Sequence, residues 1–177
     1  MNETTANLLG ALSVVLADDI REAADTILGH TGETAAALVT IGSNPEITTT
    51  KLAAALNLSA AATSRVVDRL WQMGLVARFP SEDDRRSMSL HLPPKGQQMR
   101  RRVLAMRRAV TAEAVEHLSE EELASLDGIL RKILLKLTHS ETRAYNFCRL
   151  CHEEICVPMG CPVETRCLEH ERLAVAQ

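Results

Sequence analysis

The sequence predicts a mainly α-helical protein with one small β-hairpin. Apolar residues make up 46% of the chain but aromatic residues only 2%, so the core must consist of Leu, Ala, Val and Ile side chains, which suits packed helices. Apolar residues recur at helical spacing along most of the chain, and strict alternation is confined to residues 88–92. The length of 177 residues fits one domain, or one domain with an appendage.

Charge is segregated along the chain. The net charge of −3 combines net −6 over residues 1–50, net +8 over residues 51–109 and net −5 over residues 110–177. A basic middle between acidic ends predicts a localised surface for a polyanion. A solvated charged face would give the same composition, so the pattern alone does not choose between them.

The N-terminal half begins with two predicted helices. The first is amphipathic, with apolar residues at helical spacing at Leu9, Leu12, Leu16 and Ile20. The second covers residues 33–41 and is followed by a turn at the letters SNPE.

Two further helices are predicted in close succession. Thr48 or Thr49 can cap a short helix that runs through Leu56, and Ser59 can cap a longer helix that Gly74 ends. Two helices joined by three or four residues form a helix-turn-helix. An ordinary helical hairpin would fit the same segment.

The longer helix has the features of a recognition helix. We expect Val66, Val67 and Leu70 to face inward. The polar and cationic residues predicted to face outward, and to bind DNA, are Ser59, Thr63, Ser64, Arg65 and Arg69. Its small first turn, read as SAAATSR, would let the helix approach base edges closely.

A β-hairpin is predicted directly after this helix. Its first strand would contain Leu75, Val76 and Phe79. In its second strand Met88, Leu90 and Leu92 alternate with polar residues, the period of a half-buried strand. The polar connection places Asp84, Arg85 and Arg86 near the tip. A hairpin in this position is a wing, and an arginine at its tip can enter a minor groove.

Two long helices are predicted to follow. Pro93 and Pro94 open the first, which runs to about Leu118 and contains Arg100 and four more arginines. Ser119 and Glu122 form a capping box that opens the second. The second carries a heptad seam at Leu123, Leu126, Leu130, Ile133 and Leu137. The seam favours a dimer interface, with an intramolecular core as the alternative.

The hairpin and recognition-helix residues resemble a known family. The letters EDDRRSMSLHLPPKG are similar to the wing signature D-x-R-x-x-x-L-x-L-T-x-x-G of the multiple antibiotic resistance regulator (MarR) family. The letters LNLSAAATSRVVDRLWQMGLVAR resemble that family's recognition helix and the strand after it. Pro93 stands where the family usually has Thr. The resemblance covers residues 5–140.

The resemblance implies a winged helix-turn-helix transcriptional regulator, a repressor rather than an enzyme. It implies a homodimer joined by its terminal helices on a pseudo-palindromic DNA operator. Arg86 corresponds to the wing arginine of the minor groove and Asp84 to the acid that orients it. Ser59, Thr63, Ser64 and Arg65 occupy recognition-helix positions. The family often holds a small-molecule effector between its dimer and DNA-binding regions.

The C-terminal segment lies outside this resemblance. All five cysteines of the chain fall in the stretch NFCRLCHEEICVPMGCPVETRC, residues 146–167. Four of them, followed by a proline, are spaced C-x2-C-x4-C-x4-C, and they are the predicted metal ligands: Cys148, Cys151, Cys156 and Cys161. Clustered thiolates bind iron–sulfur clusters and zinc. The compact spacing before a proline favours an iron–sulfur cluster, with zinc as the alternative.

Other interpretations of the cysteines stay open. They could form a metal-free thiol–disulfide sensor, or be inert. Cys148 and Cys151 could act as a thiol oxidoreductase, although no βαβ pattern surrounds them. The letters CRLCH match a c-type haem attachment motif, which is normally used outside the cytosol. A regulator with a purely structural metal is a further alternative. Where the metal senses a signal, we expect the dimer helices to transmit it to DNA.

Four regions and one compartment follow from these patterns. The regions are an N-terminal dimerisation helix at 1–30, a winged helix-turn-helix at 31–96, dimerisation helices at 97–140 and a cysteine-rich tail at 141–177. No Lys or Arg precedes Arg21, and the apolar run at residues 8–17 is too short to span a membrane. We therefore expect a cytoplasmic protein, in which structural disulfides are disfavoured.

Overall fold

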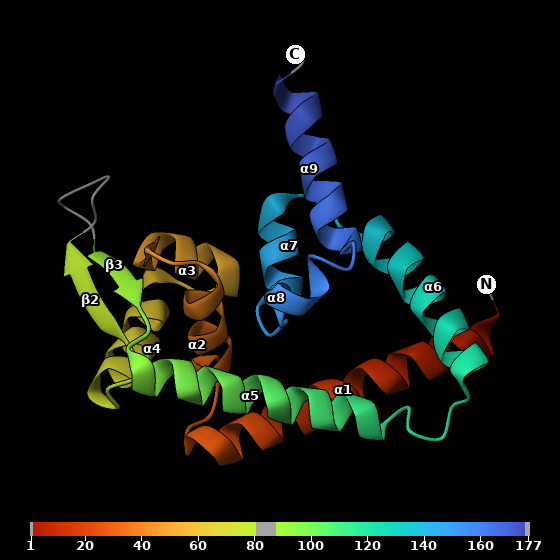
Figure 1. The fold of residues 1–177 in the computed structure, drawn as a ribbon, viewed down its shortest axis with the longest axis horizontal. Coiled ribbons are helices and arrows are strands. Elements are labelled where there is room, and N and C mark those ends of the chain that lie inside the picture. Colours follow the sequence, from red (N-terminus) through yellow and green to blue (C-terminus); the bar gives the residue numbers. More distant parts are fainter. Residues whose placement is uncertain (1, 81–87, 176–177) are drawn as a thin grey trace.

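Helices dominate the computed structural model, which describes residues 2–80 and 88–175 (Figure 1). The helices of the N-terminal half are α1 (Glu3–Leu28), α2 (Thr34–Ser43), α3 (Thr49–Leu56) and α4 (Ala60–Gln72). Those of the C-terminal half are α5 (Pro94–Glu113), α6 (Glu120–Leu137), α7 (Glu141–Cys148), α8 (Glu153–Cys156) and α9 (Pro162–Val175). Within the described residues, no helix is both long and apolar enough to cross a membrane.

Three short strands form one antiparallel sheet in the order β1-β3-β2. They are β1 (Ile47–Thr48), β2 (Ala77–Pro80) and β3 (Met88–His91). β2 and β3 are the predicted hairpin, with Arg78 opposite Leu90. β1 was not predicted, because a two-residue strand leaves no alternating pattern. It pairs Ile47 with Leu90 on the other side of β3.

Side-chain caps set the helix starts where the sequence predicts them. Thr48 accepts a hydrogen bond from the Lys51 amide, and Ser59 accepts one from the Ala62 amide. Ser119 and Glu122 form the predicted capping box. Gly74 follows α4 with φ +68°, the left-handed conformation that favours glycine.

The core lies where α2, α3 and α4 meet α5 and the sheet. Its largest fully buried side chains are aliphatic, as the composition predicts, and include Leu38, Ile41, Leu52, Leu70 and Leu90. Val67 and Leu70 of α4 face this core, and Val66 packs against its edge. The predicted helix-turn-helix with its β-hairpin is confirmed.

Two details of the hairpin and of α5 differ from the expectation. Met88 is 43% exposed and Ser89 is 3% exposed, contrary to the predicted alternation, whereas Leu90 is fully buried as predicted. The reason is that β1 extends only as far as the pair Thr48–Ser89, so Met88 lies beyond the covered part of the sheet. In addition, α5 ends at Glu113 rather than near Leu118, and turns connect it to α6.

Gly96, in the first turn of α5, is fixed by close packing. A Cβ atom at this position would lie 2.1 Å from the carbonyl oxygen of Leu75. That oxygen belongs to the backbone between α4 and β2, so it cannot move aside as a side chain can. Only glycine allows α5 to start this close to the end of the helix-turn-helix.

We predict that Gly96→Ala lowers the free energy of unfolding by about 1–3 kcal/mol, the usual cost of overpacking. Urea unfolding followed by circular dichroism measures it. Gly10→Ala in α1 is the control, because a Cβ there meets nothing within 4 Å. It should raise stability by about 0.5–1 kcal/mol through helix propensity. Equal stability of the Gly96→Ala variant and the parent would contradict the packing argument.

Candidate nucleic-acid interface and cysteine site

The outward face of α4 is small and polar near its N-terminus. Ser59, Ala60, Ala61, Ser64 and Arg65 are all exposed. Ser59 occupies the N-cap, and its Oγ accepts from the Ala62 amide at 3.2 Å. Short side chains leave the helix backbone accessible, and the helix N-terminus carries partial positive charge. This face could therefore approach an anionic groove closely.

Thr63 is not on this face, contrary to the prediction. Its side chain is fully buried, and its Oγ1 donates a hydrogen bond to the Ser59 carbonyl at 3.0 Å. Thr63 precedes the buried Val67 by four residues, so the helical period places both on the core side. The hydroxyl is hydrogen-bonded to a backbone carbonyl of its own helix, and for this reason a polar residue is tolerated in the core.

Arg69 also serves the fold rather than the outward face. Its Nη1 donates to the Thr31 carbonyl at 3.3 Å and to Thr34 Oγ1 at 3.2 Å, at the start of α2. The next basic residue, Arg78 of β2, pairs with Asp68 of α4. Of the two arginines predicted on the recognition helix, Arg65 alone has an exposed side chain.

The exposed Trp71 is a feature of α4 that the sequence reasoning missed. Its side chain is 56% exposed. It follows Ser64 by seven residues, two helical turns, and so lies on the same face. That spacing could have been used to find it. The wing residues Asp84, Arg85 and Arg86 lie outside the described residues, so the structure does not place them.

The four predicted metal ligands lie on or beside three successive helices in the C-terminal part of the chain. We call residues 141–175, with helices α7, α8 and α9, the cysteine segment. Cys148 ends α7, Cys151 lies in the turn after it, Cys156 ends α8, and Cys161 immediately precedes α9. The Cys151 amide donates to the Cys148 carbonyl at 2.7 Å, which closes the first turn.

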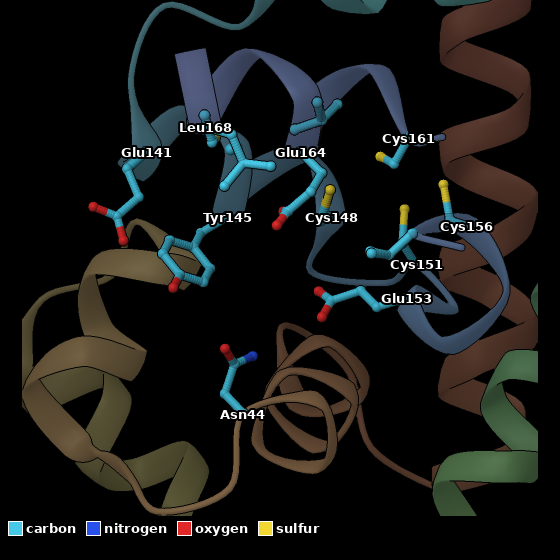
Figure 2. A pocket seen from close by; sticks show the side chains of 14 residues that line it. Asn44, Glu141, Tyr145, Cys148, Cys151, Glu153, Cys156, Cys161, Glu164 and Leu168 are labelled. Carbon is cyan, nitrogen blue, oxygen red and sulfur yellow. The ribbon is translucent and has the colours of Figure 1, made fainter. Parts of the chain in front are cut away.

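These four residues border one cavity of about 320 Å³. In Figure 2 the sulfur atoms of Cys151, Cys156 and Cys161 point into a common space, and Cys148 lies beside it near Glu164. Tyr145, Glu153 and Cys167 also line the cavity. Cys161 is only 7% exposed, and the other three predicted ligands are half-buried. The sequence-predicted set is thus brought together in space.

Electrostatics divides the four thiols into two pairs. The hydrogen bond from Cys148 and the positive charge of Arg107 lower the pKa of Cys151 to about 6, against the effect of burial. The same hydrogen bond, together with burial, raises the pKa of Cys148. Burial and a hydrogen bond with Cys161 raise the pKa of Cys156 to about 11. One pair therefore holds a thiolate near neutral pH, the form that reacts and binds metals.

The four thiols are neighbours but do not yet form a closed metal site. Across residues 2–80 and 88–175, no three His, Cys, Asp or Glu side chains stand in an arrangement that could hold a metal ion in this conformation. None of Cys148, Cys151, Cys156 and Cys161 takes part in a disulfide. His152, the histidine of the haem-like motif, contacts Glu154 Oε2 at 3.0 Å.

Arg100 connects the cysteine segment to the DNA-binding half. Its side chain is 4% exposed, so it does not contribute to a basic surface on α5. Its Nη1 pairs with Glu154 Oε1 at 2.9 Å, and its Nη2 donates to Ser43 Oγ at 2.9 Å. These two bonds join Arg100 to the end of α2, where Ser43 lies, and to the start of α8, where Glu154 lies. The guanidinium also lowers the pKa of Glu154 through the hydrogen bond.

Comparison with known proteins agrees with this architecture. Residues 33–88 match the sequence profile described as MarR family. The chain is 34% identical over 107 residues to the transcriptional repressor MprA of Escherichia coli (strain K12), covering 59% of this chain and 61% of MprA. It is 30% identical over 98 residues to the uncharacterized HTH-type transcriptional regulator YsmB of Bacillus subtilis (strain 168), covering 55% of this chain and 64% of YsmB. The match spans less than two thirds of the length of these curated relatives.

A solved structure extends the likeness to the fold. A MarR family protein from Bacillus stearothermophilus superposes with a TM-score of 0.66 at 28% identity, covering 78% of this chain and 99% of that chain. The predicted fold class, a winged helix-turn-helix flanked by long helices, is confirmed by this likeness. The family profile ends at residue 88, well before the cysteine segment.

Proposed function

We propose that this chain, which belongs to the MarR family, is a DNA-binding transcriptional repressor whose cysteine segment holds an iron–sulfur cluster. The observation that carries the DNA-binding part is the exposed, small and polar N-terminal face of α4 within a confirmed winged helix-turn-helix. The likeness to a transcriptional repressor, MprA, supports repression. MarR-family proteins are regulators and not enzymes, which speaks against a thiol oxidoreductase.

DNA recognition would use α4 and the wing together. Ser59, Ser64 and Arg65 would face the major groove, where α-helices read base edges. Arg86, oriented by Asp84, would enter the adjacent minor groove, and Arg85 would contact a phosphate. The wing assignments rest on the family resemblance of the sequence, whereas the α4 assignments rest also on exposure in the structure.

We predict that Arg65→Ala weakens DNA binding and reduces the salt dependence of the association constant by about one ion. Fluorescence anisotropy on a duplex selected in vitro by the parent protein measures both. Arg69→Ala is the matched control on the same helix, because Arg69 bonds to Thr31 and Thr34 instead. It should lower the free energy of unfolding by about 1 kcal/mol and leave the salt slope unchanged. The reverse pattern would refute the assignment of the outward face.

A homodimer would present two recognition helices to a pseudo-palindromic operator. No residue of α6 is buried in the single chain. Leu123, Leu130 and Leu137 of the predicted seam are 39–45% exposed. The N-terminal half of α1 exposes further large apolar side chains, namely Leu8, Leu9, Leu12, Val14 and Val15. Two long helices with unpaired apolar surfaces favour association with a second copy. Half-sites would then lie about one helical turn apart.

We predict a dimer at micromolar concentration, which light scattering would report as twice the chain mass. Leu130→Glu should shift the protein toward monomer, because it places a charge in the seam. Lys132→Glu, two residues away on the same helix and exposed, is the control and should leave the dimer intact. A parent protein that is monomeric, or a Leu130→Glu variant that dimerises normally, would contradict this interface.

The donor set of the cysteine segment fits a thiolate-bound cofactor. Four thiols border one cavity, and one of them is a thiolate near neutral pH. Arg131 lies within electrostatic range of Cys156 and Cys161, and Arg107 of Cys151. These guanidinium groups would offset the negative charge of a fully thiolate-bound group. Side-chain rotation at χ1 would be needed to bring the four sulfurs to equal distances from a bound group. The cavity of about 320 Å³ extends beyond the thiols to Asn44, Tyr145 and Leu168, so the preference for a cluster over zinc is based on the compact spacing of the cysteines.

We predict that replacing Cys148, Cys151, Cys156 or Cys161 by Ser lowers bound iron and sulfide, measured on protein purified without air together with its visible absorption. Cys167→Ser is the control and should retain the cluster. A colourless protein that contains zinc would identify the alternative metal. If all four variants keep their full metal content, or the parent carries none, the metal proposal is wrong. The hydrogen-bonded pair of Cys148 and Cys151 would then favour a thiol–disulfide switch.

A small-molecule effector is a second candidate signal, with the tail metal purely structural. A cavity of about 330 Å³ lies between α1, α2, α5 and the turn after α7. Arg21, Arg107 and Arg149 are among its lining residues, with Asp25 and Glu33 opposing them in charge. Arg21 already pairs with Asp18 at 2.7 Å and Arg149 with Glu33 at 3.4 Å, so an anionic organic effector would have to compete with these carboxylates.

A further inference from the structure

We infer that the cysteine site acts as a clamp between the helix-turn-helix and the dimerisation helix of the same chain, so that its occupancy reaches DNA through α3. This inference rests on the proposed function, because it concerns how the cysteine site regulates DNA binding. Figure 1 shows α7 and α8 between α3 and α6, with α9 beginning near one end of α6 and rising away from it. The route from cofactor to DNA would thus be direct and intrachain, and would not need to pass through the dimer contact.

The clamp makes two contacts with the rest of the chain, which we call its jaws. The first jaw is a contact between α7 and α3. The side-chain amide of Asn146 donates to the Ala55 carbonyl at 2.6 Å and to the Ala54 carbonyl at 3.3 Å. The Ala54 carbonyl also accepts from the Asn57 amide at 3.2 Å. The last carbonyls of a helix have few partners within it, so the bond to Ala55 in particular fixes the end of α3. α3 is the first helix of the helix-turn-helix, and its end leads through a short turn to the Ser59 cap of α4. Moving Asn146 would therefore disturb the position from which the recognition helix starts.

The second jaw is a contact between the cysteine loop and α6. Arg131 Nη1 donates to the Gly160 carbonyl at 2.7 Å, in the connection between Cys156 and Cys161. Leu134 of α6 packs against the small buried cluster of the segment, which consists of Ala144, Cys161 and Val163. The segment is thus attached to the proposed dimerisation helix on this side and to α3 on the other.

The four predicted ligands hold the two jaws together. Cys148 belongs to the α7 jaw, and Cys161 begins the α9 side next to α6. The cluster between the jaws contains three buried residues, and Cys148, Cys156 and Cys167 pack around it. So small an apolar core has little cohesion of its own. A bound cluster or metal would tie α7 to α9, whereas its loss would let them separate. Two arrangements of α3 relative to α6 would follow, and occupancy would select between them.

The test measures how much cofactor binding changes the affinity for DNA, and not the affinity for DNA alone. DNA affinity is determined for cofactor-loaded protein and for protein stripped with a chelator under reducing conditions, using the duplex selected by the parent. In the parent the two dissociation constants should differ by at least about fivefold, a usual size for coupling between sites. In Asn146→Ala the ratio should fall toward one while metal content stays at the parental level. Asn146→Asp, which turns a carboxylate toward the two carbonyls, should show the same loss.

The matched control is Glu169→Gln, because in the described part of the chain the Glu169 carboxylate forms an ion pair with Arg166 of the same helix, α9. It should keep the parental ratio. Hydrogen exchange of α3 gives a readout independent of DNA. Stripping should raise exchange of residues 49–56 in the parent, and exchange there should already be raised in loaded Asn146→Ala.

The outcomes separate the clamp from the function on which it rests. Two results would overturn the clamp alone. One is an Asn146→Ala variant whose dissociation constants with and without cofactor differ as much as those of the parent. The other is hydrogen exchange of α3 in the parent that does not change when the cofactor is stripped. A parent protein that carries no metal or cluster overturns the cofactor proposal, and the clamp with it, before any variant is compared.

Discussion

The buried guanidinium of Arg100 is the interaction on which the relation between the two halves of the chain depends. A charge that is 4% exposed is costly to bury unless it is paired and hydrogen-bonded. Arg100 meets that condition with one partner from α2, Ser43, and one from α8, Glu154. Its Nε has no hydrogen-bond partner among the described residues, so the bonds to Ser43 and Glu154 must offset the cost of burying the charge. The cysteine segment therefore supplies one of the two partners of a buried charge in the DNA-binding half, and it is not an independent appendage.

Much of the fold could be predicted because its determinants are local. The caps Thr48, Ser59 and Ser119 and the left-handed Gly74 act within one helical turn of their own positions. Sequence spacing alone shows such features. Thr63 was misplaced because it was assigned by residue type, although its distance from Val67 indicates the core side. Met88 was expected to be buried because it alternates with polar residues, and the short extent of β1, which leaves Met88 beyond the covered part of the sheet, cannot be inferred from β3.

The remaining differences come from long-range contacts. Arg69 was expected on the outward face, and Arg78 and Arg100 belong to the basic middle of the chain, yet all three are paired within the fold. Arg69 and Arg100 bond to residues far away in the sequence, and Arg78 pairs with Asp68, ten residues before it. The four candidate ligands were predicted from their clustering, but the docking of their segment was not. Asn146 bonds to main-chain oxygens 91 and 92 residues away, and a backbone acceptor leaves no mark in the sequence. The expected route through the dimer helices stays a prediction, and the contact with α3 suggests a second route that the sequence did not indicate.

These internal pairings also change how the basic middle of the chain should be understood. Residues 51–109 carry net +8, but three of their arginines are occupied within the fold. Of the described basic residues there, the exposed ones are Arg65 on the recognition helix, Lys51 on α3, and Lys95, Arg101, Arg102 and Arg108 along α5. Counterion release scales with the number of phosphates that are neutralised. DNA binding should therefore depend on salt less steeply than the composition suggests, with more of the specificity left to the close approach of α4. A small polar helix face gains most from accurate positioning, and this is the property that a clamp on α3 would control.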